Sequence, residues 1–329
     1  MNILVTGGAG FIGSNFIRYM LSKYNYNIIN LDKLTYAGDL ENLKGVDQDK
    51  RYHFIQGDIC DRDLVYRIFK NYDIDVVINF AAESHVDRSI EDSEIFIKTN
   101  IMGTQVLLDS GLRYWKMDNG TGSLKKYKPG VKFIQISTDE VYGALGKDGF
   151  FTEDTNLAPN NPYSASKAAA DMMVRAYYKT YGLPINITRC TNNYGPYQHQ
   201  EKLIPLIIYN ALKNKALPIY GDGKQVRDWL HVWDHSSAID LVFHRGQIGE
   251  VYNIGGNNER ENIEIVRFIL KFLGKGEENI AYIEDRLGHD RRYAIDSNKI
   301  KSQLGWQPLY SFEEGIKDTI RWYRDLTKL

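Results

Sequence analysis

Short apolar segments alternate with longer amphipathic ones through the first 190 residues of the chain. Apolar and β-branched side chains predict strands at residues 3–6, 28–31, 53–56, 76–80, 132–136 and 185–188. The intervening segments carry a helical period and predict helices at residues 11–22, 61–71, 93–115 and 162–181. Strands that alternate with helices are typical of a doubly wound parallel sheet, so we expect an α/β fold of the Rossmann type.

The character of the sequence changes near Thr191. Short strand-like and turn-like segments then carry aromatic residues beside arginines, and helices are predicted at 263–272 and 312–326. A chain of this length predicts about two domains. We expect a Rossmann-type domain over mainly 1–198, with return segments around 228–256, and a smaller α/β lobe over mainly 199–329. Arginines beside aromatic rings suit a nucleotide base and a diphosphate.

Composition and charge narrow the classes of function. The formal net charge of −1 gives no general attraction to nucleic acid or to an anionic membrane. The longest apolar run, residues 203–212, is too short for a bilayer, and no targeting segment precedes the first strand. We therefore expect a cytoplasmic protein. Cys60 and Cys190 have no metal-ligand spacing, which predicts reduced thiols and no metal site.

A glycine-rich turn follows the first predicted strand. Gly7, Gly10 and Gly13 give the spacing G-x-x-G-x-x-G between a strand and a helix. The first glycine permits a tight turn, the second lets a pyrophosphate approach the backbone, and the third allows close helix–strand packing. Asp32 ends the second strand, where an acid accepts hydrogen bonds from a ribose 2′-hydroxyl and repels a 2′-phosphate. NAD is therefore the predicted cofactor, rather than NADP.

Other predicted strands end in residues suited to ligand contacts, because open α/β sheets bind ligands at the carboxyl ends of their strands. Asp58 follows the third strand and is expected near the adenine. Ala81 and Ala82 follow the fourth and would let the backbone lie along the cofactor. His85 and Arg88, a few residues further on, are expected to face the ligand. Residues 118–130, rich in Gly, Lys and Asn, are expected to form a surface loop.

Two groups of residues suggest acid–base chemistry. Thr138, Asp139 and Glu140 follow the fifth strand, and two adjacent carboxyls keep one of them protonated near neutral pH because like charges raise a pKa. Tyr163 and Lys167 are at i and i+4 of a helix that Asn161 would cap. A nearby ammonium is expected to lower the pKa of the Tyr163 phenol and make it a base for a sugar hydroxyl.

These features together resemble the extended short-chain dehydrogenase/reductase family over essentially the whole chain. The Asp139–Glu140 pair and the segments 82–89, 192–197 and 288–290 are similar to its nucleotide-sugar 4,6-dehydratases. The resemblance implies that Thr138, Tyr163 and Lys167 oxidise the sugar, with Asp139 as general acid and Glu140 as general base. It also implies NAD as cofactor, dTDP-glucose as substrate, and a homodimer formed through the helices near 93–115 and 162–181.

Further residues match binding positions of that family. Those implied to contact NAD are Phe11, Ile12, Asp32, Lys33, Thr35, Asp58, Ile59, Thr99, Tyr163, Lys167 and Asn193. Those implied to lie near the nucleotide sugar are Ser84, Thr138, Asn192, Lys202, Leu203, Pro218, Tyr220, Arg227, Asn262, His289 and Tyr293. Leu287 departs from the family, which often has proline there, so the resemblance does not imply the same stiffness for this substrate loop.

Other functions on the same fold stay open at this point. A different nucleotide-sugar 4,6-dehydratase, a 4-epimerase or a decarboxylase would share most of these residues. Epimerases of the family lack two acids after the Ser/Thr position, and decarboxylases typically carry one. An NAD-binding sensor would need neither Tyr163 nor Lys167.

Overall fold

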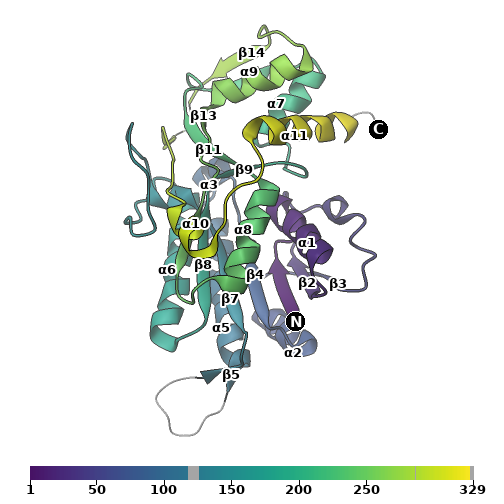
Figure 1. Ribbon diagram of the computed structural model, residues 1–329, viewed down its shortest axis with the longest axis vertical. Helices are drawn as coiled ribbons and strands as arrows, with labels where there is room; N and C mark the ends of the chain where they lie inside the picture. The colour runs from purple at the N-terminus through teal and green to yellow at the C-terminus, as the bar shows by residue number, and fades with distance from the viewer. Residues whose placement is uncertain (118–125, 286, 327–329) are drawn as a thin grey trace.

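A parallel sheet of seven strands forms the centre of the molecule in the computed structural model, which describes residues 1–117, 126–285 and 287–326 (Figure 1). Its strand order is β12-β8-β7-β4-β1-β2-β3, and every neighbouring pair is parallel. The strands are β1 (Asn2–Thr6), β2 (Asn27–Asp32), β3 (Tyr52–Gln56), β4 (Val76–Asn79), β7 (Lys132–Thr138), β8 (Ile185–Cys190) and β12 (Val251–Ile254). The predicted doubly wound sheet is confirmed.

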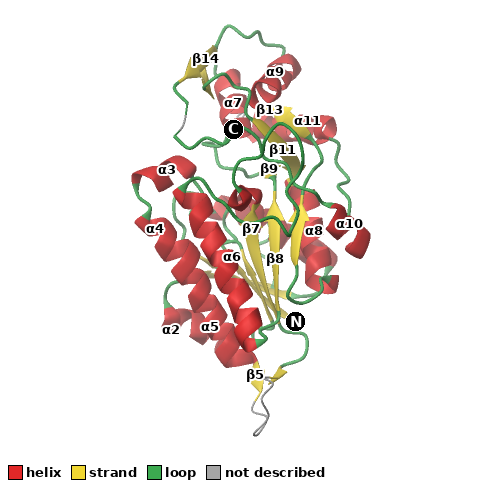
Figure 2. Cartoon of the chain, turned by 90° about the vertical axis from the view of Figure 1, so that its left-hand side faces the viewer, coloured by secondary structure: helices red, strands yellow, loops and turns green. Residues whose placement is uncertain are grey.

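Helices cover both faces of this sheet. One face carries α1 (Phe11–Lys23) packed against α8 (Val232–Arg245), and the other carries α2 (Arg62–Tyr72), α5 (Thr104–Trp115) and α6 (Pro162–Tyr181), which lie side by side in Figure 2. Successive strand residues serve opposite faces, because side chains alternate along a strand. Leu4 packs into the core under α2 and α5, while Ile3 and Val5 pack under α1.

The helix predicted at 93–115 is interrupted. The structure has α3 (Val86–Glu91), α4 (Glu94–Phe96), a π-helical segment η2 (Ile97–Gly103) and then α5. Within η2, the Asn100 side chain accepts a hydrogen bond from the backbone N–H of Glu83 (2.9 Å) and donates one to its carbonyl (3.0 Å). These bonds tie the widened helix to the loop after β4, a tertiary contact that helical periodicity does not encode.

A second lobe lies beyond the carboxyl ends of the main sheet. It contains the sheet β13-β11-β9, with β9 (Asn192–Tyr194), β11 (Val226–His231) and β13 (Glu259–Glu261), and the pair β10 (Leu217–Tyr220) and β14 (Ile280–Ile283). Ile207, Ile265 and Ile316 belong to its own apolar core. They come from its three helices, α7 (Leu203–Leu212), α9 (Asn262–Leu273) and α11 (Phe312–Leu326). In Figure 1 these helices stand at the top of the view.

Asparagine, glycine and proline at 192–196 predict a loop from the sequence, and the structure shows a strand in the first half of this segment. Asn192, Asn193 and Tyr194 form β9, which pairs in parallel with Trp229, Leu230 and His231 of β11. The partner strand is more than thirty residues away in sequence, so the local pattern of asparagine, glycine and proline did not reveal the pairing.

The remaining elements are short. They are η1 (Leu40–Leu43), β5 (Lys116–Met117), β6 (Lys126–Tyr127), η3 (Asp139–Tyr142) and α10 (Asn298–Leu304). Residues 118–125 of the expected surface loop lie outside the described residues. Across the described part of the chain we find no helix with the length and hydropathy needed to cross a membrane.

Candidate active site

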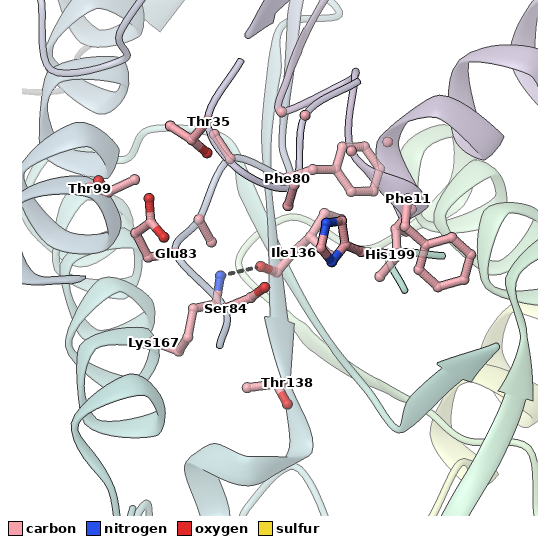
Figure 3. A pocket seen from close by; sticks show the side chains of 18 of the residues that line it. Phe11, Thr35, Phe80, Glu83, Ser84, Thr99, Ile136, Thr138, Lys167 and His199 are labelled. Carbon is pink, nitrogen blue, oxygen red and sulfur yellow. Dashed lines mark hydrogen bonds between the residues drawn. The ribbon is translucent and has the colours of Figure 1, made fainter. Parts of the chain in front are cut away.

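A cleft follows the carboxyl ends of β1, β2, β4, β7 and β8 and holds both groups of residues singled out in the sequence (Figure 3). Every residue expected to bind the cofactor lines it, namely Gly7, Gly10, Phe11, Ile12, Gly13, Asp32, Lys33, Thr35, Asp58, Ile59, Ala81, Ala82, Thr99, Tyr163, Lys167 and Asn193. Thr138, Asp139 and Glu140 line the same cleft. The structure therefore brings the expected cofactor and catalytic residues together.

Two glycines of the turn after β1 are required by close backbone contacts. Gly7 has φ +69°, and a Cβ there would lie 2.7 Å from the Cα of Ala81. A Cβ on Gly13 would lie 2.4 Å from the carbonyl oxygen of Gly7. A Cβ on Gly10 would meet no atom closer than 3.3 Å, so its lack of a side chain serves the open space of the cleft. Together they leave a backbone cradle at the N-terminus of α1.

Asp32 is held rigidly at the end of β2. Its two carboxylate oxygens accept hydrogen bonds from the backbone N–H groups of Ala9 and Leu34, both at 2.8 Å. Burial raises the pKa of Asp32, while these two hydrogen bonds lower it. Next to it, the Lys33 ammonium lies 2.8 Å from the Asp58 carboxylate. Two strand ends are thus joined where a ribose and an adenine are expected.

Thr138 ends β7 and organises the two acids after it. Its hydroxyl accepts a hydrogen bond from the backbone N–H of Glu140 (3.3 Å) and donates one to Asp139 Oδ1 (3.2 Å). Asp139 is only 2% exposed, and we find no partner for its Oδ2 within the described residues. Burial, and then the charge of Glu140, raises the pKa of Asp139 well above its usual range. The direction of this shift is the one expected for a general acid.

Tyr163 lies in the first turn of α6, which a capping box fixes. The Ser164 N–H donates to Asn161 Oδ1 at 2.9 Å, the Ser164 side chain reaches back to the Asn161 N–H, and Pro162 occupies the first position. One turn further along α6, the Lys167 ammonium donates to the carbonyl of Ile136 at 2.7 Å (Figure 3). The helix thus directs both side chains at the end of β7.

The expected lowering of the Tyr163 pKa is wrong for this structure. Burial is the largest influence and raises the pKa well above its usual value, and the negative charge of Glu140 adds to it. The hydrogen bond from Thr138 acts in the opposite direction but does not outweigh them. The sequence argument counted the cation at i+4 and omitted the cost of burying a phenolate next to a carboxylate.

The expected substrate residues are divided between two places. Ser84, Asn192 and Lys202 line the cleft, as does Thr138. The others do not line it, and these are His85, Arg88, Leu203, Pro218, Tyr220, Arg227, Asn262, His289 and Tyr293. His85 and Arg88 lie at its side, within 3.5 and 3.7 Å of Glu201 respectively.

Several of the outlying residues form a cluster in the second lobe. The Arg227 guanidinium donates to the carbonyl of Asp290 (2.9 Å) and lies over the Tyr293 ring, 4.4 Å from its centroid. The positive charge of Arg227 lowers the pKa of Asp139, and the negative charge of Glu140 raises that of Tyr293. Arg227 and Tyr293 of the second lobe therefore lie near the acid pair, although neither lines the cleft.

Other cleft residues were missed by sequence reasoning. Glu83, Cys190, His199 and Glu201 line the cleft. Glu83 is buried, and burial raises its pKa. Its position beside the alanines after β4 was an available signal, whereas Glu201 follows no predicted strand. In the part of the chain that the structure describes, no group of three or more His, Cys, Asp or Glu residues could hold a metal ion.

Known proteins share both the sequence and the fold. The profile of the family described as GDP-mannose 4,6 dehydratase matches residues 4–319. A dTDP-glucose 4,6-dehydratase from Xanthomonas campestris pv. campestris (strain B100) is 54% identical, over 97% of this chain and 92% of its own length. The crystal structure of dTDP-glucose 4,6-dehydratase from Bacillus anthracis str. Ames in complex with NAD is 53% identical, with a TM-score of 0.90 over 100% of this chain and 98% of that one. A UDP-glucose 4-epimerase from Thermotoga maritima, solved with UDP-glucose, is 31% identical, with a TM-score of 0.88 over 99% of this chain and 100% of that one.

Proposed function

Because the chain belongs to the GDP-mannose 4,6 dehydratase family, we propose that it is a dTDP-glucose 4,6-dehydratase with NAD as its cofactor. The reaction converts dTDP-glucose to dTDP-4-keto-6-deoxy-glucose with loss of water. The observation that carries the proposal is the pair Asp139–Glu140, placed in one cleft with Thr138 and Tyr163. A simple oxidation at C4 requires one base, whereas an elimination also requires an acid and a second base.

The residues of the cleft fit NAD. The backbone cradle at Gly7 and Gly13 leaves the N-terminus of α1 open to a pyrophosphate, and Asp32 lies at the end of β2 where a ribose would be bound. Bound NAD would take up hydrogen from C4 of the sugar and return it to C6 later in the cycle.

The side chains of the protein move the protons of this reaction. Tyr163 removes the proton of the sugar 4-hydroxyl as the 4-ketone forms. For this step it must first lose its own proton, which burial and the charge of Glu140 oppose and which the neighbouring Lys167 ammonium would favour. The ketone acidifies the C5 proton, which Glu140 removes. Asp139 is protonated because its pKa is raised, and it donates its proton to the departing 6-hydroxyl. Glu140 then returns a proton to C5.

The nucleotide sugar would extend from the acid pair toward the second lobe. Ser84, Asn192 and Lys202 already line the cleft, and Arg227 and Tyr293 lie near the acid pair. A guanidinium and aromatic rings suit a diphosphate and a thymine base. His85, Arg88, Leu203, Pro218, Tyr220, Asn262 and His289 stay predicted substrate contacts.

We further propose that the protein acts in the cytoplasm as a homodimer and supplies rhamnose-type deoxysugar biosynthesis. Exposed apolar side chains on the helical face around η2 and α6 support the dimer, since Ile97, Met102 and Met172 are each at least half exposed. Light scattering coupled to size-exclusion chromatography would measure the mass. A mass that stays monomeric at micromolar concentration would contradict the dimer.

An isotope experiment tests the proposed activity. The protein would receive dTDP-glucose carrying deuterium at C4, mixed with unlabelled substrate of distinguishable mass. Deuterium should appear at C6 of a product lighter by one water, without crossing between the two substrate populations. Deuterium at C4 of an unchanged-mass sugar with inverted configuration would identify an epimerase. Since dTDP-glucose carries no carboxyl group, a decarboxylase would be identified in a parallel incubation with a nucleotide-linked uronic acid, by loss of carbon dioxide. No conversion of either sugar would favour an NAD-binding sensor.

A further inference from the structure

The Lys167 ammonium lies in an environment that disfavours its charge. The side chain is only 4% exposed, and its hydrogen bond within the structure goes to the neutral carbonyl of Ile136. Burial is the largest influence on its pKa and lowers it, and the charge of Asp171 opposes this effect. A counter-charge is therefore needed if Lys167 is to stay an ammonium beside Tyr163.

Asp171 is in position to supply that charge. It follows Lys167 by four residues on α6, so the two side chains lie on the same face of the helix. Asp171 is 1% exposed, and its Oδ2 accepts a hydrogen bond from Arg189 Nε at 2.9 Å. Its Oδ1 has no hydrogen-bond partner among the described residues. One buried carboxylate thus lies beside two buried cations, Lys167 and Arg189.

Of the other groups around this set, Cys190 and Tyr142 are neutral, while the acids Glu153 and Glu140 act on Tyr142 and Tyr163 respectively. Burial raises the pKa of the Cys190 thiol to about 12, so it is neutral where the enzyme works. The Arg189 guanidinium also donates to the hydroxyl of Tyr142 (2.9 Å), whose pKa burial raises. The Tyr142 hydroxyl in turn donates to Asn253 (2.8 Å). Arg189 is therefore held from a second side and orients the carboxylate.

We propose that Asp171, oriented by Arg189, is a positioning residue whose carboxylate keeps the buried Lys167 charged next to Tyr163. Arg189 lies on β8 and Asp171 on the middle of α6, so the pair also fixes the helix to the sheet directly behind the reacting side chains. The inference rests on the proposed function, because it assigns Asp171 to the sugar-oxidation step.

The test separates this charge effect from a purely structural role. Asp171→Asn alone would leave the buried Arg189 guanidinium without a counter-charge, which opposes folding. The informative variant is the double substitution Asp171→Asn with Arg189→Met, which removes both charges of the pair. Formation of the reduced cofactor in a single turnover with dTDP-glucose would be followed from neutral to alkaline pH. This readout follows sugar oxidation and does not require Asp139 or Glu140.

The alkaline midpoint of the pH–rate profile for sugar oxidation should be lower in the double variant than in the wild type by about one pH unit or more, because Lys167 loses its proton at a lower pH. Its free energy of unfolding gives a second readout. A lysine with a lowered pKa in the folded state makes the protein more stable as the pH rises from the folded to the unfolded pKa. In the double variant the folded pKa of Lys167 should be lower than in the wild type, so this rise in stability should begin at a lower pH. Asp240→Asn is the matched control, as Asp240 is 3% exposed, pairs with Lys23 at 3.0 Å and lies on α8. It should lower stability without moving the pH profile.

A folded double variant with an unshifted rate profile would overturn the inference and leave Asp171 as a structural partner of Arg189. An equal shift in Asp240→Asn would overturn it as well. Wild-type protein that fails to dehydrate dTDP-glucose would instead overturn the proposed function, so the two failures are distinguishable.

Discussion

At the scale of single residues, Asp139 and Tyr163 show what the sequence reveals about charge and what it hides. The adjacent acids predicted a raised carboxyl pKa, and Asp139 has one, although burial contributes more to it than the charge of Glu140. The pKa of Tyr163 is raised, whereas the sequence predicted a lowered one, because the burial of its side chain depends on packing between distant segments. Positions can therefore be predicted from a pattern of residues, while pKa values need the surroundings.

Substituting the acid pair separates oxidation from water loss. Asp139→Asn or Glu140→Gln keeps the shape and removes proton transfer, so water loss should slow by about 10²–10⁴-fold. The reduced cofactor should still appear in a single turnover, measured by its absorbance. Exposed Glu41→Gln serves as the control and should behave like the wild type. Normal turnover by both cleft variants would contradict their roles.

The pH dependence of water loss follows from the same pair. Burial and then Glu140 raise the pKa of Asp139, so this acid keeps its proton to a higher pH than an ordinary aspartate and loses it as the pH rises further. Glu140→Gln removes the neighbouring charge and lowers that pKa. The residual water loss of this variant should therefore decline at a lower pH than that of the wild type, as mass spectrometry of the product across pH would show. An identical or higher midpoint would contradict the coupling.

Asp32 provides a separate prediction about cofactor choice. Asp32→Ala should weaken NAD binding and bring the affinities for NAD and NADP closer together. The carboxylate that Ala9 and Leu34 hold in place would no longer accept a hydrogen bond from the ribose or repel a 2′-phosphate. Isothermal titration with both cofactors measures the two affinities. Equal affinities of the unaltered protein for NAD and NADP would show that Asp32 does not select the cofactor.

At the scale of elements, local signals decided what could be predicted. The predicted bounds of α6 and α11 agree with the structure, and for α6 the capping box and Gly182, at φ +69°, mark both ends within the sequence. The π-helical turns of η2 and the pairing of β9 depend on Glu83 and Trp229 far away in sequence. Such features are set by tertiary contacts, which a window of residues does not contain.

The cap of α6 should matter for both stability and catalysis. Asn161→Ala removes the bond to Ser164 and should lower the free energy of unfolding by about 1 kcal/mol, measured by denaturant titration. Since Tyr163 lies in the same turn, the single-turnover rate should also fall. Asp61→Ala is the matched control, because Asp61 caps α2 through the N–H of Leu64. A similar loss of stability is expected there, with an unchanged rate.

At the scale of the whole molecule, all the residues predicted to bind the cofactor line the cleft, whereas most of those predicted to lie near the substrate do not. Residues at strand ends such as Asp32 and Asp58 meet because parallel strands place their carboxyl ends along one edge. Arg227 and Tyr293 come near the acid pair only through the placement of the second lobe. That placement depends on packing between distant segments, which no short motif encodes.

His231 lies where β11 of the second lobe meets α8 of the main sheet, and its burial should make the stability of the protein sensitive to acid. It ends β11, caps α8 and stacks on Tyr310, with ring centroids 4.0 Å apart. Burial lowers its pKa to about 4, so between pH 6.5 and 4 the unfolded chain binds the extra proton. Stability should therefore fall as the pH drops through this window, by about 3 kcal/mol at its lower end.

Denaturant titrations across this pH range check the prediction. His231→Phe should flatten the dependence, because the residue that takes up the proton on unfolding is gone. His53→Phe, at an exposed position on β3, should leave the dependence as in the wild type. A wild-type slope that persists unchanged in His231→Phe would assign the acid sensitivity to other groups.

The edge strand β12 should determine whether the Rossmann-type part of the chain can be produced alone as a fragment. β12 pairs with the outer edge of β8, from Ile187 with Val251 to Cys190 with Ile254. A fragment that ends at residue 198 would lack β12 and expose the backbone N–H and C=O groups of a strand rich in apolar and β-branched residues. Unprotected edges of this kind pair with other chains. The fragment should accumulate in inclusion bodies. Co-expression of residues 199–329, which contain β12, should shift it to the soluble fraction of the cell lysate.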